Sequence, residues 1–203
     1  MKQALPYLLV AMLLAWACGC SKTEKGKIGT DADYDAYIDE GTPSDNYGLS
    51  ATLKCGVDSS GNQRQILFWF DHSWFQQNLP KGAKITKVVL KIYVTGVSGG
   101  GGGTFYLAEV DESWSETSVT WNNRPSKSPS LFSFTGPTQS GWYEISDSAL
   151  KALVQDWLAG YTNYGICIYP SYSLSQGTGF SCSSVEGVST NHPKLIVYYE
   201  EKK

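Results

Sequence analysis

Residues 113–125, SWSETSVTWNNRP, combine side chains that recur in sugar-binding sites. An aromatic ring such as that of Trp114 or Trp121 stacks on the apolar C–H face of a sugar, while Arg124 and nearby asparagines bond its hydroxyls. The same residue types also build corners of β-sandwiches, because asparagine tolerates left-handed backbone and large aromatic side chains dominate cores. The segment therefore favours an architectural corner, with Trp121 and Arg124 as the alternative sugar contacts.

A second group of chemically capable residues is acidic and lies in residues 33–48, DYDAYIDEGTPSDNYG. Carboxylates on a loop, together with backbone carbonyls, can hold Ca²⁺. Asp35 and Asp39 are four residues apart on one face of an expected strand, which makes them the candidate ligand pair for a structural calcium ion. Their spacing does not match an EF-hand loop, and a solvated acidic loop with Asx turns is the competing interpretation.

Catalytic constellations are weaker. A glycoside hydrolase needs two carboxylates that converge on the scissile bond. The remaining candidates carry no local pattern that marks such a pair: Glu109, Asp111, Glu112, Glu116 and Glu186. His72 and His192 do not accompany a G-x-S-x-G nucleophile motif. The sequence therefore predicts a binding protein and not an enzyme.

The N-terminus indicates export. Lys2 precedes a nearly unbroken apolar run, Leu5–Ala17, that is too short to span a bilayer comfortably. The run ends in AWACGCS, and small residues followed by cysteine resemble a bacterial lipobox. We predict a signal peptide over residues 1–19 and lipidation at Cys20, with Cys18 as the alternative. An ordinary secretory signal with incidental cysteines is the competing interpretation.

The expected location is the bacterial cell envelope. Ser21 after the cysteine resembles the sorting pattern of outer-membrane lipoproteins, on the periplasmic or the surface-exposed face. Residues 20–30 are polar and rich in lysine, which predicts a flexible tether between the lipid anchor and one domain over residues 31–203. Without the signal peptide, 15 basic and 19 acidic residues give a net charge of −4. This acidic balance argues against nucleic acid as a partner.

Three cysteines remain in the expected domain. Cys167 and Cys182 lie in consecutive predicted strands, so an oxidising compartment would allow them to form a disulfide. Cys55 would then be the odd thiol. Other pairings stay open, because the distance between strands decides them. A metal site built from the three cysteines is disfavoured, since they lack C-x-x-C spacing.

Short strands dominate the expected secondary structure. KITKVVLKIYV places Val88, Leu90, Ile92 and Val94 on one face and Lys87, Val89, Lys91 and Tyr93 on the other, the alternation of a half-buried strand. The predicted strands are Tyr34–Asp39, Ala51–Gly56, Gln65–Asp71, Ile85–Val94, Thr104–Val110, Ser118–Trp121, Leu131–Phe134, Trp142–Ile145, Gly165–Tyr169, Gly179–Ser183 and Lys194–Tyr199.

One helix interrupts these strands. Ser146 or Asp147 is suited to cap it, and an apolar stripe at helical spacing follows: Leu150, Leu153, Val154, Trp157 and Leu158. Gly160 marks its end. Many antiparallel strands with one short α-helix predict an all-β fold, a jelly-roll antiparallel β-sandwich.

The order of the motifs resembles the DNRLRE family, also described as carbohydrate-binding module family 96. The motifs that carry the resemblance are DAYIDEGTPSDNYG (35–48), LKCG (53–56), ILFWFD (66–71), LPKGAKITKVVLKIYV (79–94), WSETSVTWNNRP (114–125), DWLAGYTNYGI (156–166) and PKLIVYY (193–199). The resemblance implies a jelly roll that binds polysaccharide without cleaving it. Members typically carry a basic residue where this chain has Trp69, so a purely anionic ligand is not implied here.

Four residues are the expected polysaccharide contacts: Trp69, Arg64, Trp121 and Arg124. If Phe68 and Phe70 face the core, Trp69 points the other way and is exposed. Aromatic stacking and neutral hydrogen bonds would favour neutral or weakly charged glycans. The alternative is a structural or assembly protein of the envelope, in which the same sandwich binds a protein partner.

Overall fold

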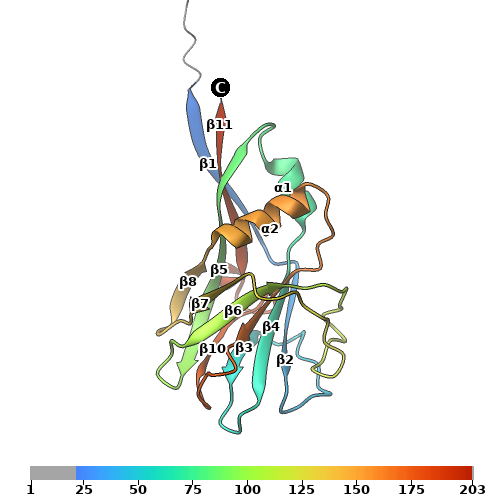
Figure 1. Cartoon of the computed structure of the whole chain (residues 1–203), viewed down its shortest axis with the longest axis vertical. Helices are drawn as coiled ribbons and strands as arrows, with labels where there is room; N and C mark the ends of the chain where they lie inside the picture. The colour runs from blue at the N-terminus through green and yellow to red at the C-terminus, as the bar shows by residue number, and fades with distance from the viewer. Residues whose placement is uncertain (1–21, 203) are drawn as a thin grey trace, which may run out of the picture.

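The computed structural model describes residues 22–202; the predicted signal peptide, Cys18 and Cys20 lie outside them. Within this range the chain forms eleven strands, two α-helices and one short 3₁₀ helix (Figure 1). The strands are β1 (Thr23–Asp31), β2 (Tyr34–Asp39), β3 (Thr52–Val57), β4 (Gln63–Trp69), β5 (Lys84–Ser98), β6 (Thr104–Glu109), β7 (Phe132–Thr135), β8 (Gly141–Ile145), β9 (Ile166–Pro170), β10 (Gly179–Ser183) and β11 (Lys194–Lys202). The helices are α1 (His72–Asn78), α2 (Ser148–Leu158) and η1 (Ser189–Asn191).

All strand pairs are antiparallel, and the sheet runs in the order β1-β11-β5-β10-β3-β4-β9-β6-β7, with β8 on β5 and β2 on β4. β3 and β4 form only two residue pairs, next to their hairpin, and the hydrogen-bonded sheet passes from one layer of the sandwich to the other at this point. One layer contains β1, β11, β5, β8, β10 and β3, and the other contains β2, β4, β9, β6 and β7. Phe105 of β6 meets Phe180 of β10 across the interior, with ring centroids 5.1 Å apart. The predicted all-β sandwich is confirmed.

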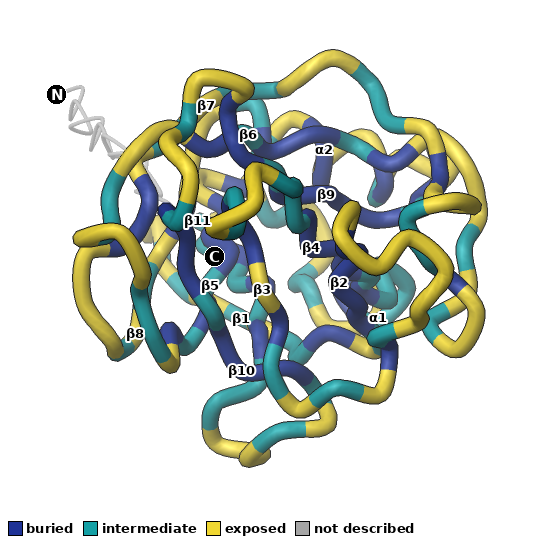
Figure 2. Tube along the Cα trace, turned by 90° about the horizontal axis from the view of Figure 1, so that it is seen from below, coloured by how far each residue is buried: buried dark blue, intermediate teal, exposed yellow. Residues whose placement is uncertain are grey.

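The core lies between the layers. Val88, Leu90, Ile92 and Val94 of β5 are fully buried, as their alternation predicted, and so is Phe68 of β4. Seen from below, buried strands fill the interior and exposed loops surround them (Figure 2). Burial of apolar side chains from both layers is what holds the two halves of the sheet together.

The predicted helix is confirmed as α2. Asp147 caps it by accepting a hydrogen bond from the backbone N–H of Ala149, and the predicted apolar stripe packs on the core. A second helix, α1, was not predicted, so the expectation of one helix was wrong. It has a single buried residue, Phe75, and therefore little of the apolar period that identifies a helix. No helix within residues 22–202 has the length and apolarity to cross a membrane.

A second apolar cluster lies on the opposite side of β2, β4 and β9 from the core. We call it the outer cluster; it consists of Ala36, Ile38, Leu67, Val110, Val119 and Cys167. Residues 110–128, the covering segment, lie over it with Trp114 and Trp121 packed against it. The predicted strand Ser118–Trp121 was wrong, because these residues form a turn, irregular backbone and a bend. The Asn123 side chain accepts from the backbone N–H of Thr120 and donates to the carbonyl of Ser118, which replaces the bonds of a strand ladder.

The expected flexible tether over residues 20–30 also needs correction. Residues from Thr23 onward belong to β1, which pairs with β11 in continuous register from Thr23–Lys202 to Asp31–Lys194. Gly26 allows a close approach here: a Cβ atom on it would lie 2.5 Å from the Tyr199 ring. The polar composition that suggested a tether is that of a charged sheet edge.

The predicted Cys167–Cys182 disulfide is wrong. Both thiols are free and buried, as is that of Cys55. Consecutive strands are not neighbours here: β9 pairs with β4 and β6, whereas β10 pairs with β3 and β5. Cys167 accordingly packs in the outer cluster and Cys182 in the core. Burial raises the pKa of the Cys167 thiol to about 12, so it behaves as a small apolar side chain.

Candidate functional site

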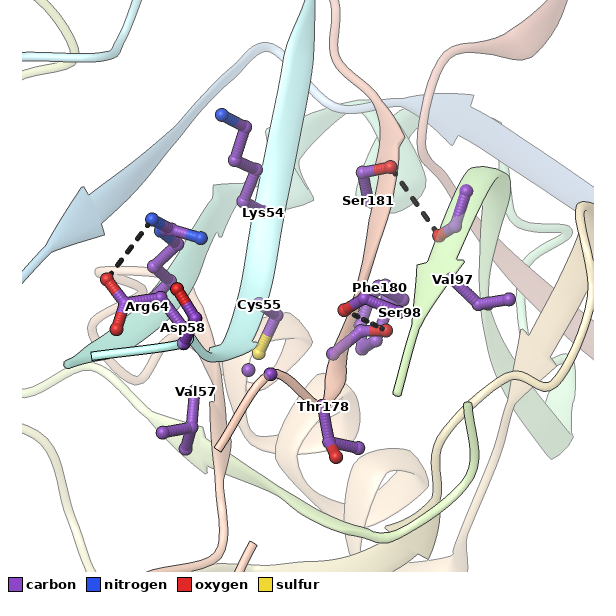
Figure 3. Close-up of a pocket in the computed structure, with 15 residues that line it drawn as sticks. Lys54, Cys55, Val57, Asp58, Arg64, Val97, Ser98, Thr178, Phe180 and Ser181 are labelled. Carbon is purple, nitrogen blue, oxygen red and sulfur yellow. Dashed lines mark hydrogen bonds and ion pairs between the residues drawn. The ribbon is translucent and has the colours of Figure 1, made fainter. Parts of the chain in front are cut away.

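A groove of about 480 Å³ opens on the side of β3, β5 and β10 that faces away from the core (Figure 3). Part of its lining follows from the alternation of the strands, because Lys54 and Ser181 point outward next to the core residues Leu53 and Cys182. Two core residues, Cys55 and Phe180, also border the groove. The groove is lined by Lys54, Gly56, Arg64, Gly96, Ser98 and Ser181, among others. The labelled parts of β3 and β10, two of the strands that line it, lie toward the end of the molecule opposite the start of β1 and the end of β11 (Figure 1).

The floor of the groove is hollow because two glycines face each other there. Gly56 and Gly179 are partners in the β3–β10 pair. A Cβ atom on Gly56 would lie 2.4 Å from the carbonyl oxygen of Thr178, and one on Gly179 would lie 2.5 Å from that of Cys55. Gly56 also has a φ of +140°, which L side chains rarely adopt. The close approach of these strands thus requires glycine and leaves space above it.

One wall of the groove carries two basic side chains, Arg64 and Lys54. The Arg64 Nε donates to Asp39 Oδ2 at 2.6 Å, and an Arg64 terminal nitrogen lies 3.4 Å from Asp58 Oδ2. These ion pairs fix the guanidinium while leaving further N–H donors for a ligand. The exposed Lys54 ammonium lies 5.6 Å from the centre of the Tyr37 ring. Figure 3 shows Lys54 and Arg64 on the same side of the groove, with Val97 across from them.

An aromatic pair lies on the same side of the sheet as the groove. Trp142 of β8 is the cross-strand partner of Tyr93 of β5, and their rings meet edge to face with centroids 5.4 Å apart. The Lys91 ammonium lies 5.0 Å from the Trp142 ring centre. The Trp142 side chain is exposed, with 40% of its surface accessible. An exposed indole of this kind provides a flat apolar surface for the C–H face of a sugar.

Hydroxyl groups connect this pair to the groove. Thr95 follows Tyr93 by two positions on β5 and donates from its hydroxyl to that of Ser181 at 3.0 Å. Ser181 lines the groove. We define the polar face as the outward side of β8, β5, β10 and β3 that carries Trp142, Tyr93, Thr95, Ser181 and Lys54. The wetter face of residues 85–94 was recognised in the sequence, but Trp142 was missed as a contact although Trp142 and Glu144 alternate with Tyr143 and Ile145.

Trp69 lies elsewhere. Phe68 and Phe70 face the core as expected, and Trp69 points to the other side of β4. One face of its indole is covered by Tyr34, which stacks on it at 4.7 Å between ring centroids. Its Nε1 donates to the carbonyl of Asn163 at 3.1 Å. Trp69 is therefore half-buried and its polar atom is satisfied within the domain.

Trp121 and Arg124 contact each other. The Arg124 guanidinium stacks on the Trp121 ring, with its central carbon 4.3 Å from the ring centre, and donates to the Trp121 carbonyl. The ring also packs against the outer cluster. Of the four predicted sugar contacts, the structure places Arg64 at the groove, whereas Trp69, Trp121 and Arg124 do not line it.

The two predicted calcium ligands belong to different surroundings. Asp35 is buried beside Glu116 and Glu186, and one carboxylate oxygen from each of the three lies within 4.8 Å of the others. Burial raises the pKa of Asp35 to about 8; the hydrogen bond from Val185 opposes this shift, and the charges of Glu186 and Glu116 add to it. Asp39 instead bonds Arg64 and the backbone N–H of Gly41. In the sequence, Glu116 and Glu186 are among the carboxylates without a catalytic pattern, and no local motif indicates that they lie next to Asp35.

The antiparallel sandwich with an open polar face, bearing an aromatic pair and a groove, defines a ligand-binding β-sandwich domain. Residues 28–199 match carbohydrate-binding module family 96, and the chain belongs to that family. A comparison with curated proteins found no match. The family supports carbohydrate binding as the function of this chain, and its modules bind carbohydrate, generally without catalysis.

Proposed function

We propose that the chain binds a polysaccharide along the polar face, without cleaving it. The observation that carries this proposal is the combination of an exposed Trp142–Tyr93 pair and a groove on one continuous sheet face, in a member of a carbohydrate-binding family. A sugar ring stacks on Trp142, and the chain continues past Thr95 and Ser181 to the donors of Lys54 and Arg64.

The charge of the groove favours neutral or weakly acidic glycans. Arg64 lies between the carboxylates of Asp39 and Asp58, so that with Lys54 this wall carries two positive and two negative charges. Asp58 is the one carboxylate among the described residues that line the groove. Its Oδ1 accepts from the backbone N–H groups of Ser60 and Asn62, so it is committed to the β3–β4 hairpin. Hydrolysis of a glycosidic bond needs a pair of carboxyl groups, which supports binding without cleavage.

The position of the N-terminal end fits display from a membrane. β1 begins at the end of the domain far from the groove (Figure 1). A lipid on Cys20, or alternatively on Cys18, would attach the domain by that end and direct the groove away from the bilayer. We therefore propose a lipid-anchored envelope protein, at the outer membrane, whose polysaccharide-binding face points outward from its anchor.

A protein partner in the envelope is the second candidate. Such a partner could add a strand to β1, whose pairing among the described strands is with β11. Lys25 and Lys27 lie along β1, and charged side chains on an edge strand oppose strand addition. The structure thus favours the carbohydrate proposal, and retention of envelope proteins by a β1-dependent contact is the observation that would support the alternative.

Affinity electrophoresis through gels containing neutral and uronate polysaccharides tests the proposal. The native protein is expected to be retarded by at least one glycan. Trp142→Ala and Lys54→Ala should each weaken that retardation about tenfold, which corresponds to roughly 1.4 kcal/mol. Tyr161→Ala is the matched control, because Tyr161 is 68% exposed and follows α2, outside the polar face.

Three results would contradict the proposal. Equal retardation of the native protein and a Trp142→Ala/Lys54→Ala double variant would show that sugar binds elsewhere. Release of shorter oligosaccharides from the glycan during prolonged incubation would show that the chain cleaves its ligand. If no glycan retarded the protein, the second candidate, binding of a protein partner in the envelope, would be favoured instead.

A further inference from the structure

We propose that Asp35, Glu116 and Glu186 bind one calcium ion that joins three separate segments of the sandwich. Asp35 belongs to β2, Glu116 to the covering segment, and Glu186 to the turn that follows β10. One carboxylate oxygen of each lies within 4.8 Å of the others, a spacing that a single ion between them can span. This inference is independent of carbohydrate binding at the polar face.

The protein holds these carboxylates in place through its backbone. The Asp35 N–H donates to Glu116 Oε1 at 2.8 Å, and the Val185 N–H donates to Asp35 Oδ2 at 3.0 Å. The Asn46 side chain donates to the Glu116 carbonyl at 2.8 Å. Gly48 packs so closely that a Cβ atom on it would lie 1.9 Å from the same carbonyl oxygen. The cluster is therefore positioned before any ion arrives, which lowers the cost of binding.

A second observation points to a ligand at this place. Asp35 has no accessible surface, and its Oδ1 accepts no hydrogen bond from any described residue. Buried polar atoms in folded proteins nearly always have a partner, and a buried carboxylate oxygen without one is strongly destabilising. A cation bound to Oδ1 supplies that partner.

Charge leads to the same conclusion. None of the ion pairs found between described residues links Asp35, Glu116 or Glu186 to a lysine, arginine or histidine. Three carboxylates held together without a counter-ion repel one another. A divalent cation removes this repulsion, whereas separation of the side chains would break the backbone bonds to Asp35 and Glu116.

The donor set selects the kind of ion. All three groups offer carboxylate oxygen, which suits hard cations and does not suit the nitrogen and sulfur preference of zinc. Calcium accepts six to eight oxygen ligands in irregular geometry, and magnesium requires a near-ideal octahedron. Glu186 is exposed and Glu116 is partly exposed, so water can complete the coordination from that side. These features favour calcium.

Thermal unfolding and calorimetric titration of the purified protein test the inference after dialysis against EDTA and then metal-free buffer. One calcium ion is expected to bind, and calcium at a hundredfold excess over Kd should raise Tm by roughly 5–10 °C. Magnesium at the same concentration should give a smaller shift. Asp35→Asn should abolish the calcium shift, because the amide retains the shape of the side chain without its charge.

Two further variants keep the test decisive. Glu186→Gln changes an exposed side chain without altering its shape, and it should weaken calcium binding at least tenfold. Glu112→Gln is the matched control: it lies in the covering segment, carries the same charge change, and is outside the cluster. It should keep the full shift. The inference is overturned if calcium neither binds nor raises Tm in the native protein, if Glu186→Gln keeps native affinity, or if magnesium matches calcium.

Discussion

Two groups of aromatic side chains lie on opposite layers of the sandwich and differ in their exposure: one packs against the protein, and the other is accessible to a ligand. In the covering segment, Trp114 and Trp121 pack on the outer cluster, and Trp114 Nε1 donates to the carbonyl of Tyr164 at 2.9 Å. On the polar face, Trp142 lies on a plain strand and keeps much of its indole exposed. The tryptophans of the covering segment thus have a packing role. Trp142, the aromatic side chain available to a ligand, belongs to no recognisable sequence motif.

The two regions differ in whether their polar atoms have hydrogen-bond partners within the domain. Side chains near Trp121 bond within the covering segment: Asn123 bonds Thr120 and Ser118, and Arg124 bonds the Trp121 carbonyl. On the polar face, Lys54 is exposed and free of ion pairs among the described contacts with acidic side chains. Donors without a partner on the same sheet face as an exposed ring suit a polysaccharide, because one sugar can stack on the ring while hydroxyls further along the chain accept from the donors.

The largest effect that would test this comparison is Trp114→Ala. The change removes the edge contact to Tyr34 at 5.1 Å and the bond to Tyr164, and it opens a cavity over the outer cluster. We expect a loss of about 3 kcal/mol in the free energy of unfolding, measured with urea, because truncation of a large packed aromatic costs this much. Polysaccharide affinity of the folded variant should not change.

Tyr161→Ala serves as the stability control for this variant, since its exposed ring makes little packing. The division between the two regions would be broken if Trp114→Ala lost affinity while its unfolding free energy stayed within about 1 kcal/mol of the native value. That outcome would place the covering segment in contact with the ligand.

Much of the fold followed from local patterns in the sequence, because β5 and α2 each carry a period that can be recognised without their partners. Residues 88–94 and the stripe of α2 are examples in which period alone identified the buried face. Helix α1 was not predicted, because a seven-residue helix with one buried side chain has no recognisable apolar period. Strand β1 was not predicted for two reasons. The partner strand β11 lies at the other end of the chain, and the polar composition of β1 resembles that of a linker.

The sites were less predictable because they form from residues that are distant in sequence. Asp35 meets Glu116 across 81 positions, and Tyr93 meets Trp142 through the β5–β8 register. Asp39 was paired with Asp35 because they share a strand face, yet Asp39 reaches Arg64 instead. Cys167 and Cys182 were paired because they lie in consecutive strands, but these strands are not neighbours in the sheet. Sequence order does not give strand order in such a fold.

A smaller loss of stability is expected for Arg64→Met. Arg64 has a structural role in its ion pair with Asp39 and a proposed binding role at the groove. The change leaves Asp39, which is 5% exposed, without its cation. We expect a loss of about 1–2 kcal/mol of stability in urea unfolding, less than for a fully buried pair because the Arg64 side chain is 30% exposed. Affinity should also fall, since a donor at the groove is lost.

The double variant Arg64→Met/Asp39→Asn separates these roles. Removing the unpaired carboxylate should restore part of the stability, whereas affinity should stay low. Native affinity in both variants would remove Arg64 from the binding face and leave it as a purely structural residue.

The smallest effect on stability, Gly96→Ala, makes the sharpest distinction between packing and binding. Gly96 lines the groove, and an added Cβ atom would meet one neighbouring heavy atom within 4 Å, the Ser181 hydroxyl oxygen at 3.1 Å. That hydroxyl can rotate, so the unfolding free energy should stay within about 0.5 kcal/mol of the native value. The methyl group occupies ligand space, and affinity measured by gel retardation should fall severalfold. Lys87→Ala, also on β5 but away from the groove, should change neither quantity. An unaltered affinity in Gly96→Ala would mean that sugar contacts the Trp142 end of the polar face without entering the groove.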